Sequence, residues 1–475
     1  MKDASQAIEP NPHADVLIIG GGLSGALLAM QLLRLPGHRR ITVFEPRAEL
    51  GRGEAYSASE PGHTLNANAA RMSADPDAPD DLTHWLAAHL AAGGWPEAAA
   101  QGVPVAQLFP PRALFGRYAG ERLSQALAAA PGSSLEHVRK DVVDLFLVPG
   151  GACVEVEGGQ RWHAPQVVLA TGVYAAARTR RLDVGEGMGL VGLDPWDLSA
   201  MARLPIDAQV LIVGAGLTMV DAVLSLQQAG HRGPICVISR HGLLPQPRRQ
   251  PPAWPDFLAQ APEVRSPVQL SRALRQQCRL AQAQGIDWQA PLDTVRAHVG
   301  RLWRQASDRQ RRQFVRHLRP WWESHHHRSP PQGAALLAQL LEAGRLQVMA
   351  ATVRNVQASQ SGVELTLLPR GSATEAQVRG AALVNSSGIE YDWRRVDKPL
   401  PRQLLARGLV RPGHLALGID ADPGGALINA AGMPSQVLFA LGPPLRGLWW
   451  ESTSVTDVAA QAKALAARLV TLQRA

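Results

Sequence analysis

Three glycines and one acidic residue near the start of the sequence have the types and spacing that bind a dinucleotide. Gly20, Gly22 and Gly25 lie between two apolar runs, and Glu45 ends the next apolar run, ITVFE. The first glycine allows a tight turn, the second lets the backbone approach a pyrophosphate, and the third lets a helix pack closely on a strand. The helix N–H groups then meet the phosphates, and the acid accepts hydrogen bonds from ribose. We expect a dinucleotide site here; glycines that serve only a tight turn are the alternative.

A second, incomplete copy of this pattern follows later in the chain. Gly214 and Gly216 again follow an apolar run, but Met219 stands where a third glycine is expected and should push the helix away from the strand. The acid is replaced by Ser239, Arg240 and His241. Arg240 could pair with the 2′-phosphate of NADPH, whereas a carboxylate would repel it. An arginine can equally point to solvent, so NADH and NADPH both remain open. Two sites predict electron transfer from a nicotinamide to a flavin, with FAD at the complete site.

Strands alternating with helices must position these two turns. The stretches QVLIVGAGLTMVDAVLSL, ICVISR, GVELTLLP and AALVNSSG repeat, between residues 209 and 388, the order seen in the first half. Such alternation predicts parallel sheets covered by helices on both faces. We expect an α/β fold of two Rossmann-like dinucleotide-binding domains, with a mainly helical insertion in the second. The expected ranges are 12–204 and 389–475 for the two parts of the FAD-binding domain, and 205–388 for the NAD(P)H-binding domain, with its insertion at about 250–343.

The composition narrows the classes of function. The chain has 475 residues, of which 46% are apolar and 19% charged, so two or three domains with proper cores are expected. The three cysteines lie far apart, which argues against a zinc site, a disulfide reductase and an oxidising compartment. Since neither a signal sequence nor a membrane-spanning run is evident, we expect a cytoplasmic protein without a membrane partner. Without a second redox centre, oxygen is the obvious electron acceptor.

An arginine-rich stretch and three adjacent histidines raise two further hypotheses. Residues 301–328 carry eight arginines but only Asp308 and Glu323 as acids, in a chain of net charge +8. No nucleic-acid-binding motif accompanies them, so we interpret the stretch as a solvated helix face and expect no nucleic-acid partner. The histidines at 325–327 project in different directions on a helix, so we expect no metal site.

Four longer stretches resemble one bacterial group of FAD- and NAD(P)-binding monooxygenases. They are GRGEAYSASEPGHTLNANAARMSADPDAPDDLTHWL (51–86), LFPPRALFGRYAGERL (108–123), WWESHHHRSPP (321–331) and LFALGPPLRGLWWESTSVTDVAAQA (438–462). The group includes the FAD-dependent urate hydroxylases and the aspartate N-monooxygenase that forms nitrosuccinate. The resemblance runs from about Asp15 to the C-terminus. It implies hydroxylation that depends on NAD(P)H and oxygen, and it leaves the substrate open.

The resemblance also implies which residues hold FAD. Besides the first glycine turn and its acid, the matching positions are Thr171 and Gly172 after a strand, Gly442 at the end of the C-terminal FAD strand, and Gly447, Glu451 and Thr453 in the turn that follows. In such folds the next helix, here from about Asp457, points its N-terminus at the flavin. Its positive end would stabilise negative charge on the reduced ring. An ordinary helix-capping region is the alternative.

The candidate substrate residues are Asn66, Asn68 and Arg328. The two asparagines lie in the loop 63–73, where they suit a heteroaromatic ligand or the edge of the flavin, although asparagine is also common in plain turns. The resemblance suggests that the His/Arg segment lines the cleft, with Arg328 as an anion contact; a solvated polar turn is the alternative. For an amino-acid substrate, Arg112 could share the role of carboxylate clamp.

We therefore expect a single-component FAD-dependent monooxygenase that uses NADH or NADPH and oxygen on a small polar substrate. The favoured substrate is urate, converted to 5-hydroxyisourate through a flavin C4a-hydroperoxide, because an anionic purine suits asparagine and arginine. One alternative is N-hydroxylation of an amino acid such as L-aspartate. Another is a non-catalytic flavin-binding redox sensor, which the degenerate second glycine turn would suit. The oligomeric state is open.

Overall fold

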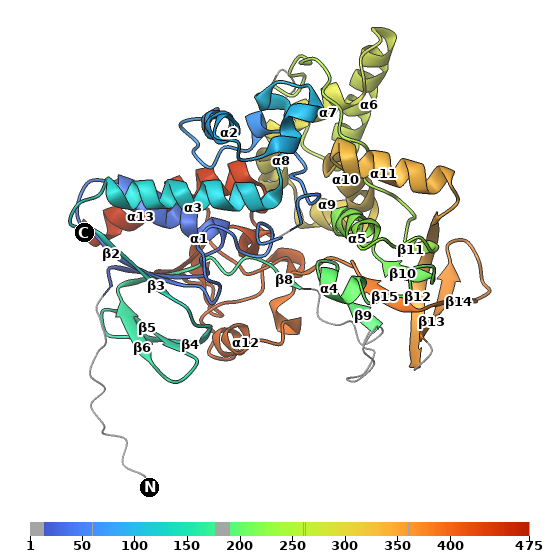
Figure 1. The fold of residues 1–475 in the computed structure, drawn as a ribbon. Coiled ribbons are helices and arrows are strands. Elements are labelled where there is room, and N and C mark those ends of the chain that lie inside the picture. Colours follow the sequence, from blue (N-terminus) through green and yellow to red (C-terminus); the bar gives the residue numbers. More distant parts are fainter. Residues whose placement is uncertain are drawn as a thin grey trace. The chain divides into compact units, whose positions relative to one another are not determined.

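The chain forms two compact units in the computed structural model, which describes residues 14–58, 60–175, 191–259, 261, 263–359 and 362–474 (Figure 1). The first unit comprises Met1–Ser59, Asn68–Tyr174 and Glu390–Ala475. The second comprises Glu60–Ala67 and Ala175–Ile389. The expected start of the first domain, residue 12, lies outside the described residues. No described helix is long and apolar enough to cross a membrane.

A six-stranded sheet forms the centre of the first unit, in the order β17-β18-β7-β1-β2-β3. Neighbouring strands pair in parallel except β17 and β18, which are antiparallel. The strands are β1 (Val16–Ile19), β2 (Arg40–Phe44), β3 (Ser134–Val138), β7 (Gln166–Leu169), β17 (Ala426–Ile428) and β18 (Pro434–Ala440). β1 is buried along its whole length, as its unbroken run of branched apolar residues predicts for a central parallel strand.

Helices cover one face of this sheet and a small antiparallel sheet covers the other (Figure 1). The helices are α1 (Leu23–Arg34), α3 (Arg112–Ala128) and α13 (Val455–Arg474), and α1 packs against both of the others. The small sheet consists of β4 (Val142–Val148), β5 (Gly151–Val156) and β6 (Arg161–Ala164). Residues of both sheets, such as Leu17 and Val154, share one apolar core. Two further helices are α2 (Asp81–Ala91) and α12 (Pro399–Ala406).

A seven-stranded sheet forms the centre of the second unit, in the order β14-β13-β12-β11-β10-β15-β9. The strands are β9 (Val191–Leu193), β10 (Val210–Val213), β11 (Ile235–Ser239), β12 (Leu346–Ser359), β13 (Gly362–Pro369), β14 (Ala376–Gly380) and β15 (Ala382–Asn385). The five strands from β12 to β9 are parallel, and β12, β13 and β14 form an antiparallel extension. The sequence pattern predicts β10, β11, β13 and β15, but β12 has no counterpart among the expected strands.

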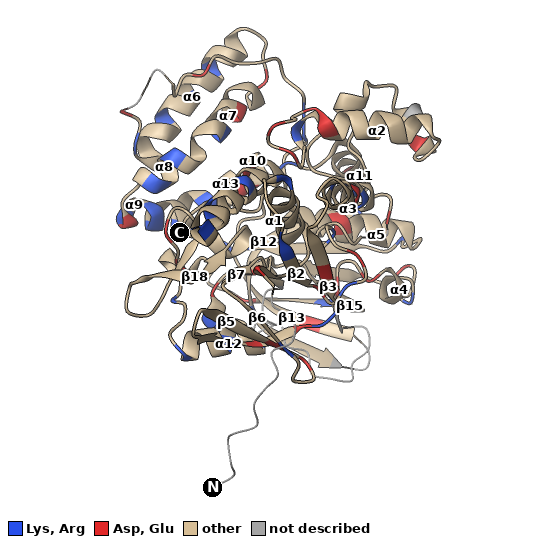
Figure 2. Cartoon of the chain, turned by 90° about the vertical axis from the view of Figure 1, so that its left-hand side faces the viewer, with Lys and Arg blue, Asp and Glu red and all other residues tan. Residues whose placement is uncertain are grey.

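Helices surround the second sheet and also form the predicted insertion. Those near the sheet are α4 (Leu198–Met201), α5 (Leu217–Gln228) and α11 (Pro331–Glu342). The insertion contains α6 (Pro267–Ala283), α7 (Gln289–Val295), α8 (Val299–Gln305), α9 (Asp308–Gln313), a π-helical turn (Phe314–Leu318) and α10 (Arg319–His326). Arginine residues lie along α6, α8 and α9, with few acids beside them (Figure 2). The insertion was expected at about 250–343, and its helices α6 to α10 lie between Pro267 and His326.

The unit boundaries fall at other residues than the expected domain boundaries. β9 pairs with β15, so residues 191–193 lie in the second unit although the boundary was expected at 204. A further eight-residue segment, Glu60–Ala67, also lies in the second unit. β8 (Tyr174–Ala175) and β16 (Ile389–Glu390) pair with each other where the chain passes between the units. Such strand pairing over long sequence separations has no local signal in the sequence.

Candidate functional site

The first glycine turn leaves no room for other side chains. Gly20 follows β1 with φ +103°, a conformation that favours glycine, and a Cβ there would lie 2.3 Å from the carbonyl oxygen of Ala170. A Cβ on Gly25 would lie 1.9 Å from the carbonyl oxygen of Gly20. Only glycine at these two positions lets α1 approach β1 and lets the turn pass beside β7.

The N-terminus of α1 begins at this turn without a capping side chain. Gly22 is its N-cap residue, and the first turn of the helix contains no acidic residue. A Cβ on Gly22 would lie 3.1 Å from the Cα atom of Gly53, so two backbone segments approach each other closely here. The first N–H groups of a helix have no partner within the helix and carry partial positive charge. This end of α1 therefore suits a pyrophosphate.

Glu45 follows β2 and lies against the same turn. The side chain is 4% exposed, and its Oε2 accepts a hydrogen bond of 3.1 Å from the backbone N–H of Gly21. Its Oε1 accepts from the backbone N–H and the guanidinium of Arg47, at 3.2 and 3.1 Å. These contacts hold the carboxylate beside the glycine turn, which is where an acid that binds ribose must lie.

The turn after β18 reaches the same end of α1. Gly442 has φ +76°, and a Cβ there would lie 2.5 Å from the hydroxyl oxygen of Ser24, in the first turn of α1. The backbone N–H of Gly442 donates to Gln461 of α13 at 3.2 Å. The remaining residues that the resemblance assigns to this turn include Glu451, which is 7% exposed, and Thr453. β7 lies between β18 and β1 in the sheet, and Thr171 and Gly172 come shortly after its last residue, Leu169; Gly172 has φ +69°.

Arg446 is a member of this turn that the sequence-based prediction missed. It is 2% exposed, and its guanidinium lies 4.2 Å from the ring centre of Trp450 and 5.8 Å from that of Tyr391. Its Nη1 also donates to the hydroxyl of Thr453 at 3.4 Å. Burying an arginine is costly unless its charge is compensated. The only signal in the sequence is its place between Gly442 and Glu451, since arginine is otherwise a surface residue.

The residues around the first turn fit a bound FAD. In the described part of the chain, the side-chain oxygen Oδ1 of Asn68 and the hydroxyl of Ser452 are buried without a hydrogen-bond partner. Buried polar atoms usually have a partner, so such atoms indicate a polar ligand or water. Both belong to the first unit, as do the glycine turn and Glu45. An uncapped helix, a buried acid and two unsatisfied polar atoms are the features that a dinucleotide site needs.

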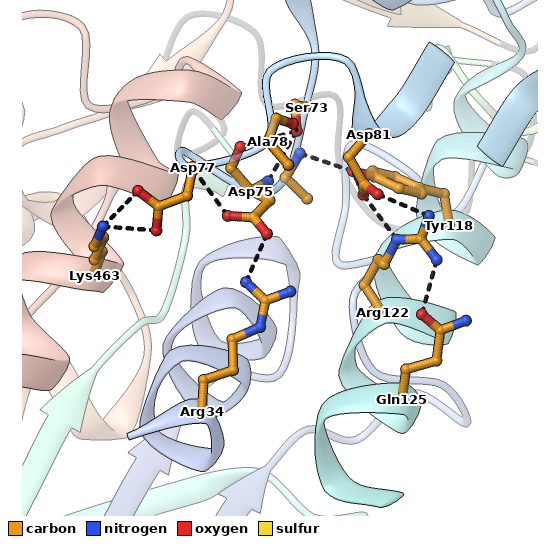
Figure 3. Close-up of polar contacts among 11 residues, drawn as sticks. Arg34, Ser73, Asp75, Asp77, Ala78, Asp81, Tyr118, Arg122, Gln125 and Lys463 are labelled. Atoms are coloured by element: carbon orange, nitrogen blue, oxygen red, sulfur yellow. Dashed lines mark hydrogen bonds and ion pairs between the residues drawn. The ribbon is translucent and has the colours of Figure 1, made fainter. Parts of the chain in front are cut away.

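The loop from Ser73 to Asp81 is fastened to the helices that carry this site (Figure 3). Three ion pairs join Asp75 to Arg34 of α1 at 2.8 Å, Asp77 to Lys463 of α13 at 2.6 Å, and Asp81 to Arg122 of α3 at 2.7 Å. Ser73 closes the loop by donating to the carbonyl groups of residues 75 and 78. The loop directly follows the segment that contains Asn68, so these contacts limit where that segment can lie.

Tyr118 of α3 completes the attachment of the loop. Its hydroxyl donates to Asp81 at 2.6 Å and accepts from the backbone N–H of Ala74 at 3.1 Å. Burial opposes the charged form of Asp81, but hydrogen bonds from Arg122 and Tyr118 outweigh it and lower the pKa of this carboxyl group. The pKa of Tyr118 is raised, because the side chain is buried and its proton is shared with Asp81.

The second glycine turn has the same backbone but a different third position. Gly214 has φ +107°, and a Cβ there would lie 2.0 Å from the carbonyl oxygen of Ser386. Gly216 is the uncapped N-cap residue of α5, and a Cβ there would meet nothing within 4 Å. Met219 is fully buried in the apolar core of the unit. The hydroxyl of Ser386 is buried without a partner among the described residues, which again fits a polar ligand.

The predicted substrate loop is divided between the two units. Asn66 lies in the second unit, where its carbonyl oxygen accepts from the guanidinium of Arg248 at 3.1 Å. His63 attaches the same segment to α5, with its Nε2 3.0 Å from the hydroxyl of Ser225. Asn68 lies in the first unit. From the sequence, residues 63–73 were expected to form one wall of a substrate site. These contacts instead give the two asparagines of this loop different surroundings.

Arg328 holds the helical insertion together. It is 1% exposed, and its nitrogens donate to the carbonyl oxygen of His325, to Gln289 at 2.7 Å and to Asp293 at 2.5 Å. Gln289 in turn accepts from the backbone of Arg249 and donates to the carbonyl of Pro247, so the guanidinium belongs to a network inside the second unit. These partners weigh against the expected role of Arg328 as an anion contact, because its guanidinium already donates to groups of the chain itself.

The three adjacent histidines have separate partners. His325 contacts the carbonyl oxygen of Trp321 at 2.8 Å, His326 stacks on Trp322 with ring centres 4.5 Å apart, and His327 lies 3.1 Å from Glu323. Among the described residues, no group of three histidine, cysteine, aspartate or glutamate side chains could hold a metal ion.

Comparison with known proteins identifies the domain and the fold. Residues 17–174 match a family model described as FAD-NAD(P)-binding. No curated protein sequence matches the chain. Among solved structures, the chain is similar to the ornithine N-hydroxylase of Kutzneria sp. 744, solved with reduced FAD, NADP+ and L-ornithine (TM-score 0.65, 14% identity, 98% of this chain and 100% of that chain). It is also similar to L-lysine 6-monooxygenase of Pseudomonas syringae, with a TM-score of 0.66 and 15% identity over 97% of this chain and 100% of that chain. A third similar structure is ornithine hydroxylase of Pseudomonas aeruginosa, with a TM-score of 0.64 and 14% identity over 97% of this chain and 100% of that chain.

These similarities cover both units and almost the whole length of each chain, so the expected fold class is confirmed. At 13–15% identity such likeness carries the architecture, not the activity. Residues 17–174 form an FAD-NAD(P)-binding domain, and the chain as a whole has the two-unit α/β fold of the flavin-dependent N-hydroxylases.

Proposed function

We propose that this protein is an FAD-dependent monooxygenase that uses NAD(P)H and oxygen to hydroxylate the nitrogen of a small amine, and that its substrate is an amino acid such as L-aspartate. The observation that carries the proposal is the correspondence of both units to amine N-hydroxylases over 97–98% of the chain. The motif resemblance to an aspartate N-monooxygenase supports the amino-acid class.

The residues of the chain bind and position the reactants. FAD, when bound, supplies the redox chemistry: it accepts electrons from the nicotinamide and passes them to oxygen. The N-terminus of α1 would hold the pyrophosphate of FAD, and Glu45 would accept hydrogen bonds from its ribose. The turn at Gly214 and Gly216 would hold the nicotinamide coenzyme in the second unit. A hydroxylase also has to keep water from the reacting atoms.

A substrate amine has to reach the site as the free base, since an ammonium has no lone pair to attack with. Its carboxylate needs a cationic partner. Of the two arginines first considered, Arg328 is engaged inside the insertion, and Arg112 is the first residue of α3, in the unit that carries the first glycine turn. Burial raises the pKa of the neighbouring Tyr56 to about 12, while the charge of Arg112 acts in the opposite direction. Arg112→Ala should therefore raise the KM for the amino acid more than it lowers kcat.

Urate is the competing substrate. The motif resemblance allows urate, but the comparisons give it no support. The similar solved structures include enzymes named as an ornithine N-hydroxylase, a lysine monooxygenase and a cadaverine monooxygenase, and the substrates in these names are amines. The two substrates require different chemistry from the same site, because urate is attacked at carbon and an amine at nitrogen. The mass of the product distinguishes them.

The test is oxidation of NAD(P)H by the purified yellow protein under air, with L-aspartate, L-ornithine, L-lysine, cadaverine or urate added in turn. We expect one amine to stimulate the rate and to gain 16 mass units. Stimulation by urate with formation of 5-hydroxyisourate would overturn the amine proposal. Failure of both coenzymes to bleach the flavin without oxygen would instead favour a redox sensor.

A further inference from the structure

Three basic side chains gather at the carboxyl end of β11 in the second unit. Arg240 and His241 follow β11 directly, and Arg370 follows β13. The Nη1 atom of Arg370 donates to Nδ1 of His241 at 2.6 Å, although the two residues are 129 positions apart. We propose that Arg240, His241 and Arg370 bind the 2′-phosphate of NADPH, so that this protein selects NADPH over NADH. The inference rests on the nicotinamide coenzyme that the proposed function requires.

The sheet register brings these residues together. Ser239, the last residue of β11, pairs with Ala350 of β12, and the next residue of β12, Ala351, pairs with Pro369 of β13. The chain therefore leaves β13 beside the end of β11. The backbone N–H of Arg370 donates to the carbonyl oxygen of Ala350 at 2.7 Å, which fixes the start of its side chain. Because β13 belongs to the antiparallel extension, a plain parallel sheet would not place an arginine here.

The two glycine turns of the chain show where a ribose would lie. The backbone N–H of Gly20 donates to the carbonyl oxygen of Phe44 at 2.9 Å, and that of Gly214 donates to Ile238 at the same distance. Because these two bonds correspond, the residues that follow the two acceptors occupy equivalent positions. They are Glu45 in the first unit and Ser239 in the second. The position that holds the ribose-binding acid in the first unit is therefore neutral in the second.

Replacing this acid changes which ribose can bind. A carboxylate accepts hydrogen bonds from a 2′-hydroxyl but repels a 2′-phosphate. The hydroxyl of Ser239 does not replace this acid, because it carries no charge, and it accepts a hydrogen bond from the backbone N–H of Gly242 at 3.0 Å. This bond closes the turn that presents Arg240 and His241. The second unit thus lacks the group that favours NADH and offers cations in its place.

The charges of the cluster suit an anion. Burial, Arg370 and Arg240 all lower the pKa of His241, so the ring is neutral, and since its Nδ1 accepts from Arg370 its proton lies on Nε2. Among the described residues, neither arginine forms an ion pair with a carboxylate. A phosphate monoester carries about 1.5 to 2 negative charges at pH 7 and has three acceptor oxygens. Two guanidinium groups and one Nε2–H donor match this group in charge and in number.

The direct test is binding of 2′,5′-ADP and of 5′-AMP to the FAD-loaded protein by calorimetry, since the two differ only in the 2′-phosphate. We expect 2′,5′-ADP to bind at least about tenfold more tightly, as charge-assisted hydrogen bonds are the strong ones. Arg370→Gln and Arg240→Gln should each weaken the binding of 2′,5′-ADP by about tenfold to a hundredfold and change the binding of 5′-AMP by less than about twofold. Arg354→Gln, an exposed arginine on β12, is the matched control and should change neither.

The same variants give a kinetic readout in anaerobic flavin reduction. The KM for NADPH should rise in Arg370→Gln and Arg240→Gln, and the preference for NADPH over NADH should shrink by the same factor as the binding ratio. Equal binding of 2′,5′-ADP and 5′-AMP by the unmodified protein, or variants that leave the ratio intact, would overturn the inference. If the flavin is not reduced by either coenzyme while 2′,5′-ADP still depends on Arg370, the proposed function fails and the phosphate site stands.

Discussion

At the scale of single residues, the two glycine turns differ in how much the fold depends on them. A Cβ on Gly25 would overlap a backbone oxygen at 1.9 Å, so a side chain there must displace α1 from β1. A Cβ on Gly216 would meet no protein atom within 4 Å, and φ at this residue is −87°, which alanine adopts readily. One glycine is needed for folding, whereas the other leaves space that only a ligand would use.

This contrast predicts opposite results for two alanine variants. Gly25→Ala should lower the melting temperature and the flavin content, because overpacking at such a contact costs about 1–3 kcal/mol or more. Gly216→Ala should leave stability unchanged or raise it by about 0.4–1 kcal/mol, yet raise the KM for NAD(P)H. Thermal unfolding and the ratio of flavin to protein absorbance check both. A destabilised Gly216→Ala variant with an unchanged KM would contradict this division of roles.

A buried histidine in the second unit is a second feature of residue scale. His231 is 3% exposed, and in the described part of the chain neither ring nitrogen has a hydrogen-bond partner. Burial lowers the pKa of this ring, Arg345 lowers it further, and Asp207 opposes them. The folded protein therefore holds the ring neutral, while the unfolded chain protonates it near pH 6.5.

The sign of the resulting pH dependence follows from linkage. Below about pH 6.5 the unfolded state binds a proton that the folded state does not, so stability falls as the pH falls, by up to about 1.4 kcal/mol per pH unit until the folded pKa is reached. His231→Phe should remove this loss while keeping a similar ring volume. Urea unfolding between pH 5 and 7.5 measures it. An equally steep loss in the variant would assign the effect to other groups.

At the scale of elements, the loop Ser73–Asp81 joins three helices that are far apart in sequence. α1, α3 and α13 each supply one cation to one aspartate of the loop. The pair between Asp81 and Arg122 is the most buried, with side-chain exposures of 20% and 17%, and Tyr118 supports it. Since α1 and α13 also carry the first glycine turn and the turn after Gly442, the loop helps to keep the FAD-binding elements in register.

Two arginines on α3 allow a matched test of this role. Arg122→Ala leaves Asp81 partly buried without its cation and should cost about 1–3 kcal/mol, together with some loss of flavin. Arg117→Ala removes an exposed pair on the same helix, with exposures of 55% and 41%, and should cost about 0–1 kcal/mol. Denaturant unfolding and flavin content compare them. Equal effects of the two substitutions would show that the loop does not hold the site.

At the scale of the whole molecule, each unit has its own sheet and its own apolar core. FAD is assigned to the first unit and the nicotinamide coenzyme to the second, so each ligand should stabilise a different set of residues. A ligand that binds only the folded state adds about 2.7 kcal/mol at a concentration a hundred times its Kd.

Hydrogen exchange with mass spectrometric detection should resolve this assignment. FAD added to the apoprotein should slow exchange in the segments 16–34 and 438–458. NADP+ added to the FAD-loaded protein should slow exchange in 210–228 and 235–245. Protection by NADP+ confined to the first unit would mean that the second glycine turn does not bind a dinucleotide.

Much of the fold could be predicted because parallel strands and glycine turns have local signals. Gly20, Gly22 and Gly25 between a branched apolar strand and an apolar helix are a pattern of short range, and so is the repeat at Gly214. The predicted strands β10, β11, β13 and β15 are all present. β12 was not predicted, because its sequence LQVMAATVRNVQAS mixes polar and apolar residues without clear alternation. Such a mixture suits a strand that has a parallel neighbour on one side and an antiparallel neighbour on the other.

Candidate residues outside these patterns depended on long-range contacts. Arg328 looks like a free cation in the sequence, but Gln289 and Asp293, which lie 39 and 35 positions away, engage it. Asn66 and Asn68 are two positions apart and yet lie in different units. Arg370 has no local signal at all. In each case the partner that decides the role of a side chain is distant in the chain.

The sequence by itself determined that two dinucleotide-binding turns exist, that the first is complete, and that the second lacks its acid. These features follow from backbone conformation and packing within about 30 residues, which residue type controls directly. Only the tertiary structure decided what replaces the missing acid, because the register of β11, β12 and β13 brings Arg370 to His241. Charge selection depends on distances of a few ångströms between side chains, and those distances are set by strand pairing rather than by spacing along the chain.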